Sequence, residues 1–403
     1  MGVCSALFEL GGMTIMHDAS GCNSTYTTHD EPRWFDMDSM VYISALTEME
    51  AIMGDDEKLL GDIEEAASAH HPKFVAIAGT PIPTMTGFDF ESVALLAESR
   101  TGLPCMGFST TGMNTYIHGA SMAFEGLARR FVEPPSVENR EGAKLRANVI
   151  GLTPLDFSIN GQDRAIVEWL EEIGFEVIST WGMNCTLEDI SRASEADVNL
   201  VVSASGVAAA HVLYERFGTP YVTGLPIGTE QKQALADMLL SYAKQAENVD
   251  KTRGDNPALT QKNPHLNKNG TICVIGEAVM SLALANAIEF ETKQNTEVLC
   301  ATEPMWVRLR EKDCLTPDEE DITEELARLH EQSKLAAVVA DPLYKPIVPK
   351  DVRFISLPSE AFSGRLYRDD IPNLVRDFDT FASNLDGQST NVPPSRQRRM
   401  GSK

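Results

Sequence analysis

The chain has 403 residues, of which 43% are hydrophobic and 23% charged, and its formal net charge is −25. This acidic balance argues against a nucleic acid or an anionic membrane surface as partner, because phosphate binding needs clustered Lys and Arg. No apolar run reaches the roughly 20 residues of a membrane span, and the start of the chain lacks the basic region of a secretory signal. The length predicts two or three domains of roughly 100–200 residues each.

Short apolar runs alternate with helical patterns along the first third of the chain. Strands are predicted at residues 13–18, 40–44, 74–79 and 105–109. Helices are predicted through residues 48–70 and 113–130. A Pro-containing break at residues 133–136 then ends this part of the pattern.

The same alternation restarts twice, at residues 147–151 and at residues 271–276. The further predicted strands are residues 175–179, 198–202, 220–222, 297–300, 336–340 and 354–357. The further predicted helices are residues 163–173, 187–196 and 206–217. A strand followed by a helix, repeated, favours parallel sheets with right-handed crossovers. The predicted fold class is therefore α/β, with three Rossmann-like domains at residues 1–144, 145–267 and 268–385 and a disordered polar tail at 386–403.

Seven cysteines are scattered along the chain without any CxxC pair: Cys4, Cys22, Cys105, Cys185, Cys273, Cys300 and Cys314. This pattern is typical neither of a disulfide framework nor of a local zinc or ferredoxin-type motif, and it fits a reducing cytoplasm best. Thiols that bind metal here must be brought together by the fold or by a second subunit.

Residues 17–23, HDASGCN, follow the first predicted strand. A cysteine on the loop that leaves a strand, with His17 and Asp18 just before it, lies where a parallel α/β sheet presents chemistry. The alternative is a packed free thiol, since cysteine is among the most buried residue types.

Phosphate-binding glycine motifs of the GxGxxG and GxxxxGK[ST] types do not occur in the sequence. Gly276-Glu277-Ala278 is a weak nucleotide-like turn and is more simply a tight turn before a helix. We therefore expect no nucleotide on this chain, so that any ATP-driven step belongs to a partner.

The segment HDASGC resembles the HGPxGC segment of the nitrogenase component 1 superfamily, with Cys22 at the cluster-ligating cysteine. That superfamily includes catalytic subunits of dark-operative protochlorophyllide reductase, nickel-sirohydrochlorin reductive cyclase and methylthio-alkane reductase. Other segments that resemble the family are residues 46–59, 148–151, 196–201, 215–220, 340–342 and 362–365. The resemblance implies three Rossmann-like domains, an iron–sulfur cluster and an ATP-dependent iron protein that delivers electrons.

The chain also departs from the nitrogenase pattern. Cys4 falls a few residues later than the upstream cluster cysteine of the family, and Gly79-Thr80-Pro81 stands where the family has a Thr-Cys pair. Residues 203–207, which resemble the loop that binds the iron-molybdenum cofactor, contain no thiol. The nitrogenase P-cluster and iron-molybdenum cofactor, bound as in nitrogenase, are therefore not expected.

Cys22 and Cys4 remain as metal ligands. Two thiolates cannot complete the four-thiolate shell of a [4Fe–4S] cluster, but two copies related by a two-fold axis can. The resulting hypothesis is a [4Fe–4S] cluster shared between subunits, in a homodimer or in a heteromer with a paralogous component 1 subunit. Asp18 is a candidate oxygen ligand of the cluster, or alternatively a loop cap. Asn23 is predicted, like Asp18, to bind the cofactor.

Three histidines are candidate proton donors for catalysis: His17, His29 and His118. His17 alternatively bonds a neighbouring carbonyl or tunes the cluster. Residues 27–34 form either a substrate pocket or docking surface, or a solvated loop with one Trp anchor. The thiols of the predicted strands and turns are expected in the core: Cys105, Cys185, Cys273 and Cys300.

Three functions remain open on these residues. The first is a nitrogenase-like reductase component that accepts electrons through the interface cluster. The second is a scaffold for assembly of a metal cofactor, and the third is a cluster-free ligand-binding α/β protein. The substrate is not determined by the sequence.

Overall fold

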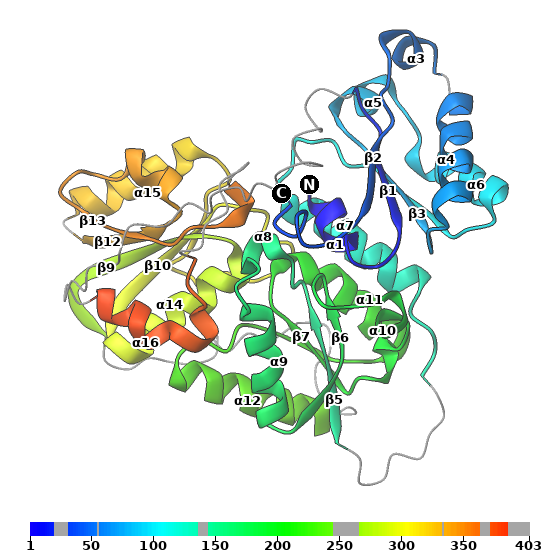
Figure 1. The fold of residues 1–403 in the computed structure, drawn as a ribbon. Helices are drawn as coiled ribbons and strands as arrows, with labels where there is room; N and C mark the ends of the chain where they lie inside the picture. Colours follow the sequence, from blue (N-terminus) through cyan, green and yellow to red (C-terminus); the bar gives the residue numbers. More distant parts are fainter. Residues whose placement is uncertain are drawn as a thin grey trace.

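The computed structural model describes residues 1–19, 31–54, 56–135, 144–244, 266–332, 334–362 and 371–385. Its strands form three parallel sheets with helices packed around them, and the three units meet near the centre of the molecule (Figure 1). This confirms the predicted α/β fold class with three parallel sheets. Among the described residues, no helix combines the length and the apolar character needed to span a bilayer.

The first unit contains a four-stranded sheet in the order β2-β1-β3-β4. Its strands are β1 (Met13–Met16), β2 (Met40–Ile43), β3 (Val75–Ala78) and β4 (Cys105–Phe108). Its helices are α1 (Gly2–Leu7), α3 (Glu48–Met53), α4 (Asp56–His70), α5 (Pro81–Thr86), α6 (Phe90–Thr101) and α7 (Tyr116–Arg130).

The single helix predicted at residues 48–70 is instead two helices. Thr47 opens α3 with a capping box, in which its hydroxyl accepts from the Glu50 backbone and the Glu50 carboxylate accepts from the Thr47 backbone. Gly54 ends α3 in the left-handed conformation, with φ of 72°, a conformation that glycine adopts without steric cost.

The second unit contains a four-stranded sheet in the order β6-β5-β7-β8. Its strands are β5 (Leu145–Ile150), β6 (Phe175–Trp181), β7 (Val198–Val201) and β8 (Tyr221–Thr223). Its helices are α8 (Pro154–Phe157), α9 (Gln162–Glu172), α10 (Leu187–Ser191), η2 (Ala193–Glu195), η3 (Ala204–Gly206), α11 (Val207–Phe217) and α12 (Thr229–Lys244). The helix predicted at 187–196 is thus a short α-helix followed by a 3₁₀ turn.

The third unit contains a five-stranded sheet in the order β11-β10-β9-β12-β13. Its strands are β9 (Asn267–Gly276), β10 (Gln294–Cys300), β11 (Cys314–Leu315), β12 (Leu335–Ala340) and β13 (Arg353–Ser356). Its helices are α14 (Ala278–Thr292), α15 (Glu319–Glu331), η4 (Pro342–Ile347), η5 (Glu360–Phe362) and α16 (Leu374–Leu385).

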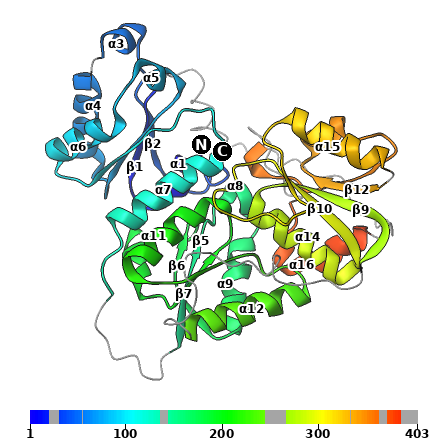
Figure 2. The ribbon, with the colours of Figure 1, turned by 180° about the vertical axis from the view of Figure 1, so that it is seen from behind.

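Helix α7 joins the first unit to the second. It packs against α1 on one side and α11 on the other, and from behind it lies beside α11 (Figure 2). The rings of Phe124 on α7 and Trp181 at the end of β6 lie edge to face, with centroids 6.2 Å apart. One buried apolar cluster includes residues of all three units, among them Phe124, Trp181 and Leu282. The units are therefore fixed against one another by shared apolar burial.

Candidate functional site

The carboxyl end of β1 presents His17, which is held in one orientation. Its Nδ1 lies 2.9 Å from Ser44 Oγ, and its ring lies 4.3 Å from the Phe88 ring, centroid to centroid. Thr80 Oγ1 donates to the His17 carbonyl at 2.9 Å. Burial lowers the pKa of His17 to about 4, so its imidazole is neutral at pH 7. The ring nitrogen therefore contacts a hydroxyl group rather than the neighbouring carbonyl expected from the sequence, and this contact orients the ring.

Asp18 continues this fixed path of the chain. Its backbone N–H donates to Ser44 Oγ at 3.1 Å, and its carbonyl accepts from the Leu46 backbone at 2.8 Å. The Asp18 residue is buried. Cys22, Asn23 and His29 lie outside the described residues, so the roles assigned to these three stay predictions.

Cys4 lies on α1 and is 1% exposed. Its side chain belongs to a small buried cluster with Met16, the last residue of β1. Burial is the largest cause of a raised pKa of the Cys4 thiol, and the Glu31 carboxylate adds to it. The fold therefore brings Cys4 next to the strand that leads toward Cys22.

A cavity of about 250 Å³ opens beside Cys4, at the carboxyl edge of the first sheet. Its wall includes Cys4, Met16, Thr80 and His118, the last of which is half-buried on α7. A Cβ atom at Gly79 in this wall would lie 2.3 Å from the Thr110 carbonyl oxygen, so only glycine fits there. The structure thus places Cys4 and His118 on one cavity, whereas His17 and Asp18 lie at the adjacent strand end.

The residues of this cavity fit one ligand of an iron–sulfur cluster. Such clusters are held by cysteine thiolates, and Cys4 supplies one buried thiol to the cavity wall. Lys and Arg are absent from the described residues of that wall, and bound iron would supply positive charge to a thiolate at Cys4.

Residues 31–34 take part in structural ion pairs. Arg33 is 5% exposed, and it contacts Glu31 at 2.7 Å and Glu9 at 2.8 Å. Its guanidinium also donates to the carbonyls of Ser5 and Gly182. Arg33 is therefore held in the interior, where it fastens α1 to the second unit.

Sequence reasoning missed a second polar site, at the junction of the three units. The Tyr116 hydroxyl at the start of α7 donates to Asp156 Oδ1 on α8. Glu277 caps α14, and its Oε1 accepts from the Ala204 backbone N–H at 2.6 Å. These side chains line a cavity of about 50 Å³. The sequence could have predicted that Glu277 caps the apolar helix that follows it. No local pattern, however, relates Glu277 to Tyr116 or Asp156.

This junction raises the pKa values of its acids. Burial, followed by the charge of Glu277, raises the pKa of Asp156 to about 8. Burial raises the pKa of Glu277, against three backbone N–H groups that favour its charged form. The pKa of Tyr116 is raised well above its usual value, first by burial and then by Asp156.

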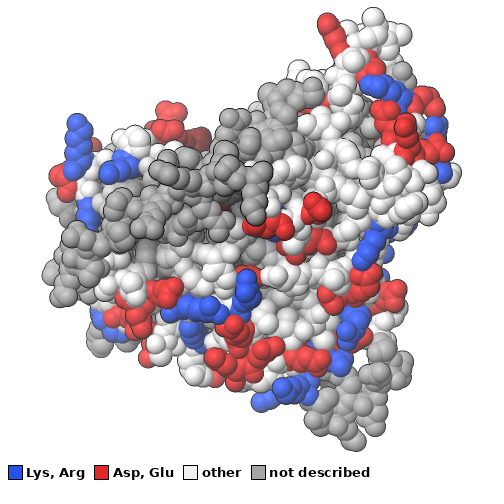
Figure 3. Space-filling view, viewed as in Figure 1, with Lys and Arg blue, Asp and Glu red and all other residues white. Residues whose placement is uncertain are grey.

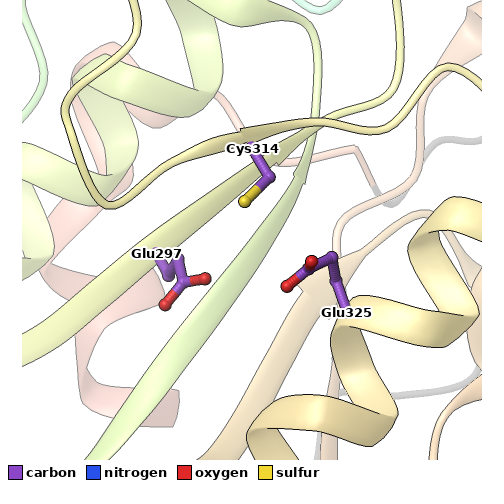
Figure 4. Close-up of side chains that lie close together, drawn as sticks. All are labelled: Glu297, Cys314 and Glu325. Carbon is purple, nitrogen blue, oxygen red and sulfur yellow. The ribbon is translucent and has the colours of Figure 1, made fainter.

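A third cluster lies in the third unit, where the side chains of Glu297, Cys314 and Glu325 point toward one another (Figure 4). Their potential ligand atoms lie within 4.8 Å. Arg328 pairs with both carboxylates, at 2.8 Å to Glu297 and 2.5 Å to Glu325. An internal cation thus already compensates these acids. The cysteines predicted in the core are buried, as expected: Cys105, Cys185, Cys273 and Cys300.

Comparison with known sequences relates the chain to a family. The chain is 28% identical over 194 residues to the nitrogenase iron-molybdenum cofactor biosynthesis protein NifE of Methanosarcina barkeri, which covers 46% of this chain and 41% of that protein. It is 26% identical over 216 residues to the nitrogenase molybdenum-iron protein alpha chain of Clostridium pasteurianum, covering 53% and 39%. It is 32% identical over 133 residues to a subunit of the light-independent protochlorophyllide reductase of Rubrivivax gelatinosus, covering 31% and 24%. The matched segments therefore span less than half of these relatives.

The fold agrees with these relationships. A solved structure of nitrogenase Cp1 at pH 5 matches 95% of this chain and 86% of its own chain, with a TM-score of 0.62 at 17% identity. The model of the nitrogenase component 1 type oxidoreductase family matches residues 1–331. This chain therefore belongs to the nitrogenase component 1 type oxidoreductase family.

Proposed function

We propose that the chain is a reductase component that accepts electrons from an ATP-dependent iron protein through a [4Fe–4S] cluster shared between two subunits. The observation that carries the proposal is the cavity on which Cys4 and His118 meet, beside the strand end that leads to Cys22. The family relationship supports the redox role. The scattered free thiols are consistent with a cytoplasmic protein.

Each residue of this edge has a proposed task. Cys4 and Cys22 hold the cluster, which supplies one-electron transfer when bound. Asp18 and Asn23 contact the cluster. His118 donates a proton inside the cavity, and His29 is a second proposed donor. His17 is a donor only as a neutral ring, and its bond to Ser44 makes orientation of the loop its principal task.

A second subunit is proposed because one chain supplies two of the four thiolates. The first unit offers a surface for it, an exposed apolar patch on the adjacent helices α3 and α5 that we name the methionine patch. Its members are Met49, Ile52, Met53, Ile82 and Met85. On the face seen in Figure 3, the tip of this unit, where α3 lies in Figure 1, is largely uncharged, and charged side chains gather beside it along the outer rim. Exposed apolar patches of this kind mark protein interfaces. The partner is an identical chain or a paralogue.

A second candidate function is a scaffold for assembly of a metal cofactor. The similarity to NifE, a protein named for cofactor biosynthesis, favours it. The two functions differ in the fate of the metal, because a scaffold transfers it to an acceptor protein whereas a reductase retains it through repeated electron transfer. Radiolabelled iron followed during turnover with the iron protein and ATP distinguishes them.

The proposed cluster is tested by iron and sulfide analysis of the anaerobically purified full chain. We expect a dimer or larger even oligomer with about one cluster per two chains, from the count of thiolates. A monomer with one cluster per chain would contradict the shared site. An iron-free, colourless protein under the same conditions would favour the cluster-free ligand-binding alternative.

Energy coupling is tested with the nucleotide. We expect no ATPase activity from this chain alone, and ATP hydrolysis together with cluster reduction when the matching iron protein is added. The acidic charge predicts that this rate falls as salt rises, since exposed charges are screened beyond roughly 8–10 Å. Cluster reduction by a simple ferredoxin without ATP would contradict this part of the proposal.

A further inference from the structure

The junction cavity is lined by one acidic or phenolic group from each of the three units. Tyr116 comes from α7, Asp156 from α8 and Glu277 from the amino-terminal cap of α14. Glu277 bridges two units directly, because its Oε1 accepts from Ala204 of the second unit as well as from Val279 of its own helix. A change of charge at this point therefore acts on the contact between units.

Side-chain cations are missing from the described wall of this cavity. Lys, Arg and His do not occur among its described lining residues, and the other acid there, Asp341, accepts backbone N–H bonds from Leu343 and Ser359. Titratable groups on the neighbouring segments include Cys300 at the end of β10, Glu303 after it and Glu360 on η5. His118 lies on α7, two residues after Tyr116. Two carboxylates in such surroundings cannot both ionise at low cost.

The hydrogen bonds show which acid stays charged. Glu277 accepts three backbone N–H bonds, from Ala204, Val279 and Met280, and these stabilise its carboxylate form. The hydroxyls of Tyr116, Ser203 and Thr153 favour the ionised form of Asp156, but burial and the charge of Glu277 outweigh them. Asp156 Oδ2 and the hydroxyl oxygen of Thr302 are buried without a hydrogen-bond partner among the described residues. Asp156 Oδ2 is thus the atom left to carry a proton, and Thr302 Oγ1 is available on the same cavity wall.

We propose that Asp156 and Glu277 share one proton at neutral pH, carried on Asp156, and that this proton closes the junction between the three units. Loss of the proton leaves two adjacent buried negative charges, which repel α8 from α14 and loosen the contact. Tyr116 lines both this cavity and the cavity beside Cys4, so loosening the junction also moves the wall of the candidate site. This inference does not depend on the proposed reductase function.

The direction of the pH effect follows from the raised pKa of Asp156, which burial and Glu277 bring to about 8. The folded chain then binds more protons than the unfolded chain between the ordinary pKa of Asp, about 4, and this value. The stability contributed by the junction is fully present below the lower value, and it is lost as the pH rises through the higher one.

The test compares full-length wild type with Asp156→Asn, which keeps an acceptor for the Tyr116 hydroxyl and removes the charge. We expect wild type to show the infrared C=O band of a protonated carboxyl group, lost with a midpoint near pH 8, and the variant to lack it. The denaturant concentration at half-unfolding should decrease for wild type as the pH is raised from about 6 to about 9. For the variant it should stay constant over this range. Asp62→Asn, on the exposed face of α4, is the matched control and should behave as wild type.

Retention of the wild-type pH dependence by Asp156→Asn would overturn the assignment. Tyr116→Phe is the second variant should Asp156→Asn fail to fold. It removes the hydroxyl that stabilises ionised Asp156. Tyr116→Phe should therefore keep the infrared C=O band of the protonated carboxyl group, and the pH at which half of this band is lost should be higher than in wild type. An unchanged midpoint in Tyr116→Phe, or a wild-type midpoint that shifts between Na⁺ and K⁺ at constant ionic strength, would contradict a shared proton.

Discussion

Two cavities share Tyr116 of α7 as a lining residue, and the side chains in their walls differ in chemistry. The cavity at the edge of the first sheet has a thiol, a histidine and threonine hydroxyls, and its volume is about 250 Å³. The junction cavity has two carboxyls and a phenol in about 50 Å³. Sulfur ligands suit iron, and a small cationless carboxyl pair suits a proton. One helix thus separates a site suited to metal chemistry from one suited to proton binding.

The sharpest contrast between the two cavities is iron binding. Cys22→Ala should abolish iron and sulfide binding with the fold retained, because the sheets keep their own apolar cores. Asp156→Asn, in the junction, should retain both. The measurement is the iron and sulfide content of anaerobically prepared protein, with Cys105→Ala, a buried thiol on β4, as control. Full iron content in Cys22→Ala would contradict the assignment of Cys22 as a ligand of the cluster.

The two regions also differ in how they are held. Arg33 fastens α1, which lines the first cavity, to the second unit. Arg33→Ala should lower the free energy of unfolding by about 3–5 kcal/mol, since it leaves buried Glu31 without this cation. Tyr116→Phe at the junction removes one hydrogen bond and should cost about 1 kcal/mol. Urea denaturation measures both.

Arg129→Ala is the control for Arg33→Ala. Arg129 pairs with Glu125 along α7 and its side chain is 58% exposed, so this change should cost less than about 1 kcal/mol. Equal losses for the two arginine variants would mean that the buried ion pairs of Arg33 stabilise the fold no more than an exposed pair does.

The comparison extends to the surface. Ile52 in the methionine patch is 71% exposed, and Ile52→Glu should raise the dissociation constant of the dimer about tenfold or more, because a charge must then be buried at the interface. Leu343→Glu, on the third unit at 59% exposure, should leave association unchanged. Sedimentation at several concentrations measures both, and equal behaviour of the two variants would exclude the patch as the interface.

Most of the fold was predictable, because strand and helix periods are local properties. The predicted strand at residues 105–109 corresponds to β4, and the one at 198–202 to β7. The errors lie where a single residue redirects the chain. Gly54 divides the predicted helix 48–70, since its left-handed conformation ends α3 within a stretch of otherwise helical spacing.

The candidate site was predictable only in part. The resemblance to the family led to residues 17–22 and Cys4, and the structure brings Cys4 against the end of β1. The structure also places His118, one of the candidate proton donors, on the wall of the cavity beside Cys4. Arg33 could not be predicted from the sequence. A charged residue in a polar segment is ordinarily expected to be solvated, and Arg33 is buried only because it lies between α1 and the second unit.

The sequence by itself determined the three parallel sheets, the buried cysteines and the family, because repeated apolar runs and ordered short motifs are readable along one chain. The tertiary structure alone decided that Tyr116, Asp156 and Glu277 meet. These residues lie on three different units, and no local pattern records a distance between them. Their raised pKa values arise from that meeting, since burial and charge proximity are properties of the packed molecule.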